Sequence, residues 1–284
     1  MITKAGIIYG IGDCLNGRAF LVTYCKQKGI EPKSIKVYTP YWDLFEKEGF
    51  TRELDRNRMR GLVGYRNFCN YDLPKVYDIP KLDECIAKNA GIDFSFDTRV
   101  PLNWNTPLNI SLPKRFVTVN NGYGRLSGNP YDLNTICTKS WDIKYWNELV
   151  LKIGVPCVQI GSGASCLPIK HTVLNLVDKL TLKQSAEVMK RALFHIDIEG
   201  GLVILNQHLG GRSVVLFGPT AIENQGRSFN LNISANVCEP CYEWGGNRYK
   251  LKVNKKDLLC GQKCMKELKP DYVIKRIYEE GWLK

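Results

Sequence analysis

Short apolar runs alternate with amphipathic stretches along most of the chain, and this alternation constrains its fold more than any other feature. Residues 5–10 have the apolar composition of a first strand, and they run into a glycine-bearing turn that opens a helix extending to about Lys28. Residues 34–38 have the pattern of the next strand. A strand, a helix and a strand in this order indicate a parallel sheet with a crossover helix, so the sequence predicts an α/β fold.

A second series of strand and helix patterns begins near residue 114. Residues 62–113 contain scattered prolines and little periodicity, which indicates the end of a first lobe. Further elements are then predicted as strands over 114–120, 156–160 and 213–217, and as helices over 141–153 and 183–193. A chain of 284 residues is long enough for two cores. We predict two Rossmann-like lobes, 1–112 and 113–284, with a final helix over 270–284 that is a candidate for packing on the first lobe.

The formal net charge of +12 favours a polyanionic partner, such as nucleic acid, an anionic glycolipid surface or a phosphorylated small molecule. A basic surface that serves only solubility is the alternative. The positive charge is densest in the segment 51–60, where guanidinium groups that match phosphate oxygens could hold an anionic acceptor. The arginines of this segment are Arg52, Arg56, Arg58 and Arg60. The alternative for this segment is a solvated loop or helix with internal ion pairs.

The chain has eleven cysteines but lacks the amino-terminal pattern of a secretory signal peptide. It also lacks a run of about 20 uncharged apolar residues, the length that a transmembrane helix needs. We therefore expect a cytoplasmic protein with reduced thiols and no transmembrane segment.

Four cysteines have the spacing of a metal site. Cys238 and Cys241 form one close pair, and Cys260 and Cys264 form a second pair after 18 intervening residues. Four thiolates favour tetrahedral zinc or iron, and a closed set of four ligands favours a structural role. Reduced core thiols are the alternative. We predict a metal knuckle over residues 238–264, inserted in the second lobe.

Four motifs in order along the chain resemble the heptosyltransferase-like glycosyltransferases of family 9. They are the turn Gly10-Ile-Gly-Asp13, the segment Lys139-Ser-Trp141 followed by Trp146, residues 197–202 and residues 214–220. The resemblance spans most of the chain and implies the GT-B fold, in which two Rossmann-like lobes face each other across a cleft. It also implies that the first lobe binds the acceptor and the second binds a nucleotide-diphosphate sugar.

Asp13 is the candidate general base. A sugar transferase must deprotonate an acceptor hydroxyl while the bond from the sugar to the diphosphate breaks. Asp13 follows the first predicted strand, at the sheet edge where α/β proteins bind ligands, and the resemblance implies this role for it, with Gly12 beside the acceptor. Capping of the following helix is the alternative role for Asp13. The resemblance implies one-step displacement with inversion at the anomeric carbon.

The donor site is predicted from two glycine-containing turns and one lysine. Glycines next to a helix start allow close approach of the backbone to phosphates, and the resemblance implies that Lys139 contacts a donor phosphate. The candidate donor-binding residues are Lys139, Glu199, Gly200, Gly201, Leu202, Gly218, Pro219 and Thr220. Ile204 stands where many relatives carry histidine. The chain has no Asp-x-Asp motif, which favours transfer without a catalytic metal.

The acceptor is the least constrained part of the hypothesis. Hydroxymethylated bases of DNA are favoured narrowly, because the chain has no basic amphipathic helix with aromatic residues for a membrane surface. The lipopolysaccharide core and protein serine or threonine are the alternatives that the resemblance implies. A non-catalytic nucleic-acid-binding zinc protein is the alternative of another class. An epimerase is disfavoured because the chain lacks the full Gly-x-Gly-x-x-Gly fingerprint and a Tyr-x-x-x-Lys pair.

Overall fold

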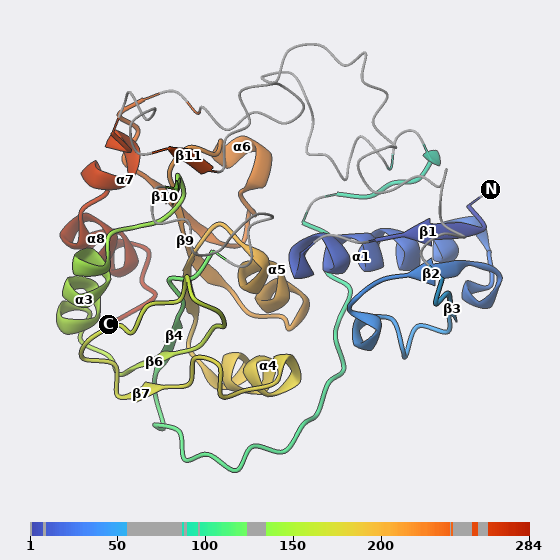
Figure 1. Ribbon diagram of the computed structural model, residues 1–284, viewed down its shortest axis with the longest axis horizontal. Helices are drawn as coiled ribbons and strands as arrows, with labels where there is room; N and C mark the ends of the chain where they lie inside the picture. The colour runs from blue at the N-terminus through green and yellow to red at the C-terminus, as the bar shows by residue number, and fades with distance from the viewer. Residues whose placement is uncertain are drawn as a thin grey trace. The chain divides into compact units, whose positions relative to one another are not determined.

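The computed structural model describes residues 2–7, 10–55, 87, 90–95, 97–123, 135–238, 240, 252–254 and 261–284 (Figure 1). The chain divides into two compact units, Met1–Leu102 and Asn103–Lys284. The boundary predicted after residue 112 therefore lies within the second unit, in the extended stretch 103–116, which precedes the first strand of that unit.

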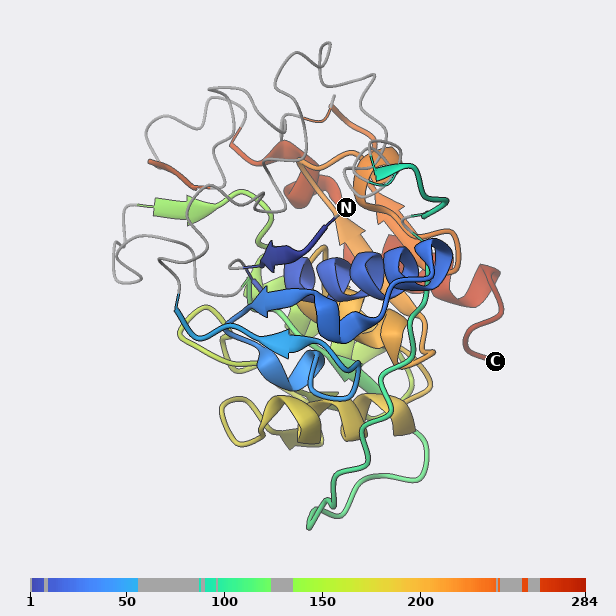
Figure 2. The ribbon, with the colours of Figure 1, turned by 90° about the vertical axis from the view of Figure 1, so that its right-hand side faces the viewer.

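The first unit contains a three-stranded parallel sheet in the order β1-β2-β3. Its strands are β1 (Lys4–Gly6), β2 (Lys36–Tyr38) and β3 (Thr51–Arg52). Helix α1 (Ile11–Lys28) connects β1 to β2 and runs along the sheet (Figure 2). It approaches closely at Gly17, where an added Cβ would lie 2.6 Å from Cδ1 of Ile7. The predicted strand–helix–strand unit is confirmed.

A buried arginine joins distant parts of the first unit. Arg18 lies on α1, forms an ion pair with Glu48, and donates hydrogen bonds of 2.8 Å to the carbonyl oxygens of both Val100 and Pro101. Its side chain is only 2% exposed. A buried guanidinium needs partners for its donors, and these three acceptors supply them. The contact holds the last residues of this unit against α1.

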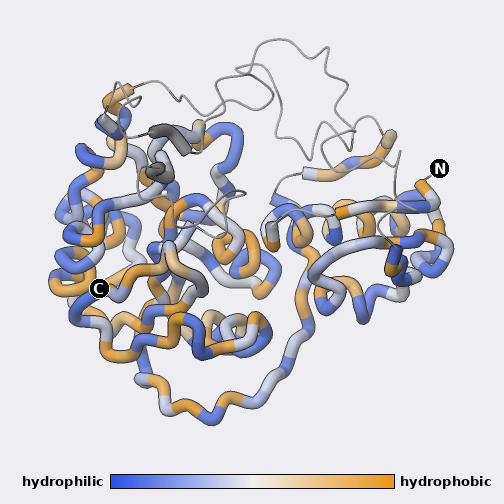
Figure 3. The backbone as a smooth tube through the Cα atoms, viewed as in Figure 1, coloured by the Kyte–Doolittle hydropathy of each residue, from blue (hydrophilic) through white to orange (hydrophobic). Residues whose placement is uncertain are grey.

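The second unit is built on a six-stranded parallel sheet in the order β10-β9-β8-β4-β6-β7. The strands are β4 (Val117–Val119), β6 (Cys157–Gln159), β7 (Leu174–Asn175), β8 (His195–Ile198), β9 (Ser213–Phe217) and β10 (Leu231–Ser234). Two further strands, β5 (Thr135–Cys137) and β11 (Lys252–Asn254), form an antiparallel pair. The hydrophobic runs of the large sheet can be followed along the tube in Figure 3.

Helices cover both faces of this sheet. They are α3 (Ile143–Lys152), α4 (Leu182–Arg191), α5 (Gly201–His208), α6 (Ile222–Gln225), α7 (Lys263–Glu267) and α8 (Pro270–Glu279). The larger core joins α3 and α8 to the apolar side chains of the central strands, including Trp146 and Ile277. On the other face Val203 of α5 packs against Val215 and Phe217 of β9. Layers of this kind are the doubly wound architecture.

Several helix ends follow from local sequence. Asp142 accepts a hydrogen bond from the amide of Lys144 and so caps α3. Thr181 and Gln184 form a reciprocal capping box at the start of α4. The final helix α8 packs against α3 of the same unit. Within the described ranges, no helix combines the length and the apolar character that crossing a bilayer requires.

Candidate functional site

The strand order of the second unit creates a topological switch point between β4 and β8. From β4 the chain proceeds to β6 and β7 on one side, and it then returns to β8, β9 and β10 on the other side. Loops that follow the two central strands therefore diverge, and open α/β sheets bind ligands in the crevice at the carboxyl ends of such strands. This edge of the sheet is the candidate site.

Three of the predicted donor-binding residues meet at this edge. Lys139, in the turn after β5, forms an ion pair with Glu199, which directly follows β8. Thr220, which follows β9, donates a hydrogen bond of 2.9 Å to Oε2, the same carboxylate oxygen. The side chains of Lys139 and Glu199 are 13% and 18% exposed. A cation, an anion and a hydroxyl from three loops thus converge in a partly shielded place.

The amino end of α5 lies directly after this cluster in the sequence. Gly200 is the N-cap residue with an extended backbone, Gly201 begins the helix, and Leu202 is half-buried in its first turn. The first amides of an α-helix have no partners within the helix and favour anions. Glu199 therefore connects an ion pair on one side to a helix start on the other.

Gly218 lies where the end of β9 meets α7. A Cβ added at Gly218 would lie 2.3 Å from Sδ of Met265 and 3.5 Å from Sγ of Cys264. Pro219 follows and is buried. The segment after α7 is held by Trp141, whose Nε1 donates to the carbonyl oxygen of Leu268 at 2.8 Å. A side chain at position 218 would require the Met265 side chain to move.

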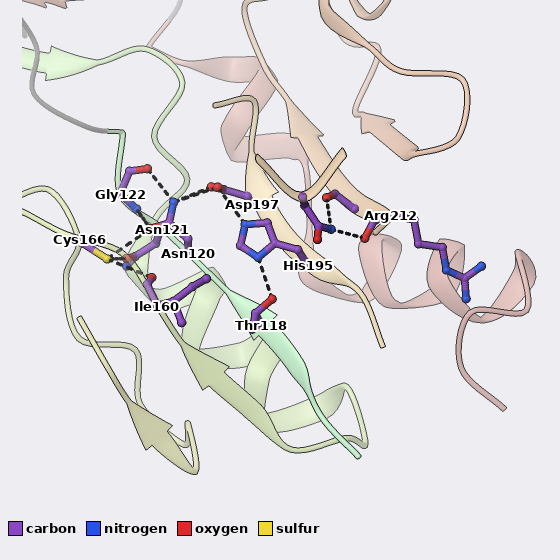
Figure 4. Close-up of polar contacts among 11 residues, drawn as sticks. Thr118, Asn120, Asn121, Gly122, Ile160, Cys166, His195, Asp197 and Arg212 are labelled. Carbon is purple, nitrogen blue, oxygen red and sulfur yellow. Dashed lines mark hydrogen bonds and ion pairs between the residues drawn. The ribbon is translucent and has the colours of Figure 1, made fainter. Parts of the chain in front are cut away.

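A buried polar network lies at the switch point itself (Figure 4). Nδ2 of Asn120, after β4, donates to both carboxyl oxygens of Asp197 on β8 at 2.9 Å. Nε2 of His195 lies 3.2 Å from Oδ2 of Asp197, and Nδ1 of His195 lies 3.0 Å from Oγ1 of Thr118. His195 and Asp197 are 0% and 1% exposed. Asp197 begins one of the four motifs found in the sequence, but no role was predicted for it or for Asn120, His195 and Thr118. Polar side chains two positions apart in a buried strand are a detectable signal.

The surroundings of Asp197 oppose its ionisation. Burial raises the pKa of Asp197, while the hydrogen bond and charge of His195 and the hydrogen bond from Asn120 act in the opposite direction. The net effect is a raised pKa. The carboxyl group is therefore held in a fixed orientation by its partners, away from solvent.

Asp13 and Gly12 lie in the first turn of α1, in the first unit. The N-cap residue of this helix is Gly10, so Asp13 is not the N-cap. One carboxyl oxygen of Asp13 lies 3.8 Å from the position of a Cβ added at Gly10. An anionic side chain in a first helical turn is stabilised by the helix dipole. Asp13 thus follows β1 at the carboxyl edge of the first unit's sheet.

The predicted arginine cluster is described only at Arg52. This residue ends β3 and is exposed, and its guanidinium carbon lies 5.4 Å from the ring centroid of Trp42. Arg56, Arg58 and Arg60 lie outside the described residues.

The predicted metal knuckle is also described only in part. Cys238 is exposed and Cys264 is buried, whereas Cys241 and Cys260 lie outside the described residues. Among the residues that the structure does describe, no group of three or more metal-ligating side chains is assembled. The knuckle remains a prediction.

Four further cysteines within the described residues, Cys14, Cys25, Cys157 and Cys166, are buried in the core. Burial raises the pKa of Cys14 and of Cys157 to about 12 and that of Cys166 to about 11. Thiols of this kind are poor nucleophiles near neutral pH.

Comparison with known proteins gives matches in structure only. No protein-family profile matches the chain. No curated protein sequence matches it either.

Three groups of solved structures are similar over nearly the whole chain. The first is TibC of enterotoxigenic E. coli, a dodecameric iron-containing heptosyltransferase crystallised with ADP-D-β-D-heptose, with a TM-score of 0.69 and 12% identity over 98% of this chain and 76% of TibC. The family 9 glycosyltransferase of Veillonella parvula has a TM-score of 0.58 and 12% identity over 98% and 96% of the two chains. The E. coli ADP-heptose lipopolysaccharide heptosyltransferase II has a TM-score of 0.54 and 13% identity over 97% and 98%. At such identities the likeness is one of fold, and the predicted GT-B fold class is confirmed.

Proposed function

We propose that this chain is a glycosyltransferase that takes a sugar from a nucleotide-diphosphate sugar bound at the carboxyl edge of the second unit's sheet. The observation that carries the proposal is the convergence of Lys139, Glu199 and Thr220 beside the start of α5. Each comes from a different loop, and their meeting place is the switch point edge at which this class of sheet binds ligands. Similarity to heptosyltransferases, one of them crystallised with ADP-D-β-D-heptose, supports the proposal.

The leaving group of such a reaction is a nucleoside diphosphate, whose negative charge grows as the bond to the sugar breaks. Lys139 supplies a cation for this charge, and the first amides of α5 supply oriented dipoles. Glu199 compensates the charge of Lys139 and holds this side chain near the helix start. Gly200 and Gly201 leave room for phosphate oxygens to approach the backbone.

Asp13 is proposed as the general base of a one-step displacement. The acceptor oxygen forms a bond to the anomeric carbon, the bond from that carbon to the diphosphate oxygen breaks, and the acceptor proton passes to the Asp13 carboxylate. Attack from the side opposite the leaving group inverts the anomeric centre. Gly12, which is buried next to Asp13 in the first turn of α1, is proposed to lie beside the acceptor.

For the acceptor, we propose an anionic glycan of the lipopolysaccharide-core type. The support is similarity to the lipopolysaccharide heptosyltransferase II of E. coli. Hydroxymethylated DNA, the acceptor favoured from the sequence, depends on an arginine cluster of which only Arg52 is described, and that side chain lies against Trp42. Both acceptors belong in the experiment. The proposed transfer uses no catalytic metal, since the chain lacks an Asp-x-Asp motif.

A structural zinc or iron ion on Cys238, Cys241, Cys260 and Cys264 is proposed as well. Four thiolates are a donor set that suits either metal, and TibC is described as iron-containing. Cys264 packs beside Gly218, so the ion would stabilise the segment on which the end of β9 rests. Elemental analysis of the purified protein tests this proposal: about one zinc or iron ion per chain is expected, and the metal should be lost in Cys238→Ser.

The activity itself is tested by incubating the protein with ADP-heptose and a panel of other nucleotide sugars. Parallel reactions contain deacylated lipopolysaccharide core, hydroxymethylated DNA or no acceptor, and both nucleoside diphosphate release and acceptor mass are measured. Release that requires one acceptor, with the mass of one sugar added to it, would support the proposal. The absence of release with every donor and acceptor would contradict it.

A further inference from the structure

One amide side chain connects the ends of three neighbouring strands in the second unit. Asn120 follows β4, and its Nδ2 donates to both carboxyl oxygens of Asp197 on β8 and to the carbonyl oxygen of Gly122 at 3.1 Å. Its Oδ1 accepts from the amide of Gly122 at 3.1 Å and from Sγ of Cys166 at 3.4 Å. Cys166 belongs to the loop that follows β6. Asn120 thus uses both ends of its carboxamide.

The space around this amide is closed by two glycines. A Cβ at Gly161 would lie 2.5 Å from Oδ1 of Asn120 and 2.7 Å from Sγ of Cys166. A Cβ at Gly122 would lie 3.2 Å from the same Oδ1. Gly161 also has a φ of +138°, which few other residues adopt. Side chains at these two positions would therefore crowd the carboxamide of Asn120.

The orientation of Asp197 is fixed from its other side. His195 lies two positions earlier on β8, contacts Oδ2 of Asp197 through Nε2, and contacts Thr118 through Nδ1. Figure 4 shows Thr118, His195, Asp197 and Asn120 in one continuous line of contacts that leads toward the loop at Gly122. Burial of this many polar groups is costly unless every contact is made. The backbone hydrogen bonds of the sheet already join β4 and β8, so the network is not needed to pair these strands.

The network lies at the edge where the donor would bind. Asp197 lies two positions before Glu199, which is the partner of Lys139 and the residue before the N-cap of α5. Asn120 begins the loop on the β4 side of the switch point. A change in the hydrogen bonding of Asp197 would move both loops that border the crevice.

We infer that Asp197 is a positioning residue of the donor site, which acts by holding Asn120 and thereby fixes the loop 120–123 relative to the turn 199–201. The inference rests on the proposed function, because it assigns the network to nucleotide-sugar binding. Asp197 itself is buried and contacts neither phosphate nor sugar in this account. Its effect on the donor is transmitted through Asn120 and through the backbone that leads to Glu199.

The test compares two buried substitutions at opposite edges of the same sheet. Asp197→Asn replaces one carboxyl oxygen with a donor amide, so it loses one of the two oxygens that accept from Nδ2 of Asn120. The control is Ser213→Ala at the amino end of β9, which removes a hydrogen bond of 3.1 Å from Nδ2 of Asn206 to Oγ of Ser213. Both substitutions remove a buried polar contact, but only one lies at the proposed site.

Calorimetric titration with ADP, repeated with UDP, GDP and CDP, gives the Kd of each variant, and thermal unfolding gives its Tm. We expect Asp197→Asn to weaken binding of the preferred diphosphate about tenfold, the effect of losing one hydrogen bond. Ser213→Ala should lower Tm and leave Kd within about twofold. Hydrogen exchange at the amide of Gly122 should be faster only in Asp197→Asn. If Asp197→Asn does not fold, Thr118→Val gives a milder test, with a smaller loss of affinity and again faster exchange at Gly122.

Equal Kd values for the position 197 or 118 variant and for Ser213→Ala would overturn the inference while leaving the proposed function intact. Failure of the folded wild-type protein to bind any of the four diphosphates would overturn the proposed function, and the inference with it. If the loss of diphosphate affinity were in proportion to the decrease in Tm, and equally so in the network variant and in Ser213→Ala, then Asp197 would have only a structural role.

Discussion

Lys139 and Glu199 form an ion pair at the carboxyl edge of the second unit's sheet, although α3, β6, β7, α4 and β8 lie between them in the sequence. Both side chains are largely shielded from solvent, so their attraction is stronger than that of an exposed pair. A diphosphate that binds here is attracted by Lys139 and repelled by the carboxylate of Glu199. The predictions below follow from this competition and from the groups around it.

Glu199→Gln removes the charge that competes with a diphosphate for Lys139. We expect this variant to bind ADP, or the diphosphate that the protein prefers, several-fold more tightly than the wild type. Sugar transfer should be slower, because Lys139 loses the partner that holds it in place. Calorimetry and initial rates measure the two effects. Weaker diphosphate binding would mean that Glu199 contacts the nucleotide directly.

Asp13→Asn removes the proposed base but keeps the shape of the side chain. Turnover should fall by about 10²- to 10⁴-fold, the contribution of a general base, while the Kd of the nucleotide sugar changes little. The matched control is Asp43→Asn, which alters an exposed aspartate in the first turn of the short helix Trp42–Leu44. Equal rates for the Asp13 variant and this control would exclude Asp13 as the base.

Thiol reactivity should separate the core cysteines from the exposed one. The pKa of Cys14 and of Cys157 is raised to about 12 and that of Cys166 to about 11, so the reactive thiolate is scarce at pH values near 8. In protein treated with a chelator, iodoacetamide should label Cys238 rapidly and these three only after unfolding in guanidinium. Peptide mass spectrometry reads the labelled positions. Labelling of Cys166 in the folded protein as fast as Cys238 would contradict the described burial.

The pH dependence of stability should reveal the buried carboxyl group. Because burial raises the pKa of Asp197, the folded protein binds a proton on this group more tightly than the unfolded chain does. The resulting stabilisation is complete below the pKa of an unfolded aspartate, about 4, and is lost as the pH rises through the higher folded-state pKa.

We therefore expect the free energy of unfolding of the wild type, relative to Asp197→Asn, to decrease as the pH rises above about 4. Urea unfolding of both proteins at a series of pH values measures this difference. A difference that grows with pH would mean that the folded-state pKa of Asp197 is lowered rather than raised.

The parts of this fold that sequence predicts are those with local signals. The apolar run Ser213–Phe217 is a strand in the structure, and the predicted end of the first helix at Lys28 agrees with α1. Part of the donor cluster was also predictable, because Glu199 and Thr220 follow the neighbouring parallel strands β8 and β9, whose carboxyl ends meet at one edge. Lys139 follows β5, which pairs antiparallel with β11, and it was predicted from the family resemblance.

The buried network around Asp197 could not be predicted from local sequence patterns. Thr118 lies opposite His195 only because β4 pairs with β8, and strand order is not a property of either segment alone. The close packing at Gly218 could not be predicted for the same reason, since the atoms nearest to an added Cβ there belong to Met265 on α7. Contacts between segments far apart in sequence depend on topology, which local patterns do not specify.

The most direct test of the account is calorimetric titration of nucleoside diphosphates into the wild type, Lys139→Ala and the control Lys144→Ala, whose exposed lysine lies in the first turn of α3. The account predicts one diphosphate bound per wild-type chain, unchanged binding by Lys144→Ala, and binding about 10- to 100-fold weaker by Lys139→Ala, the effect of losing a charged phosphate contact. Undiminished binding by Lys139→Ala, or no binding of any diphosphate by the folded wild type, would contradict it.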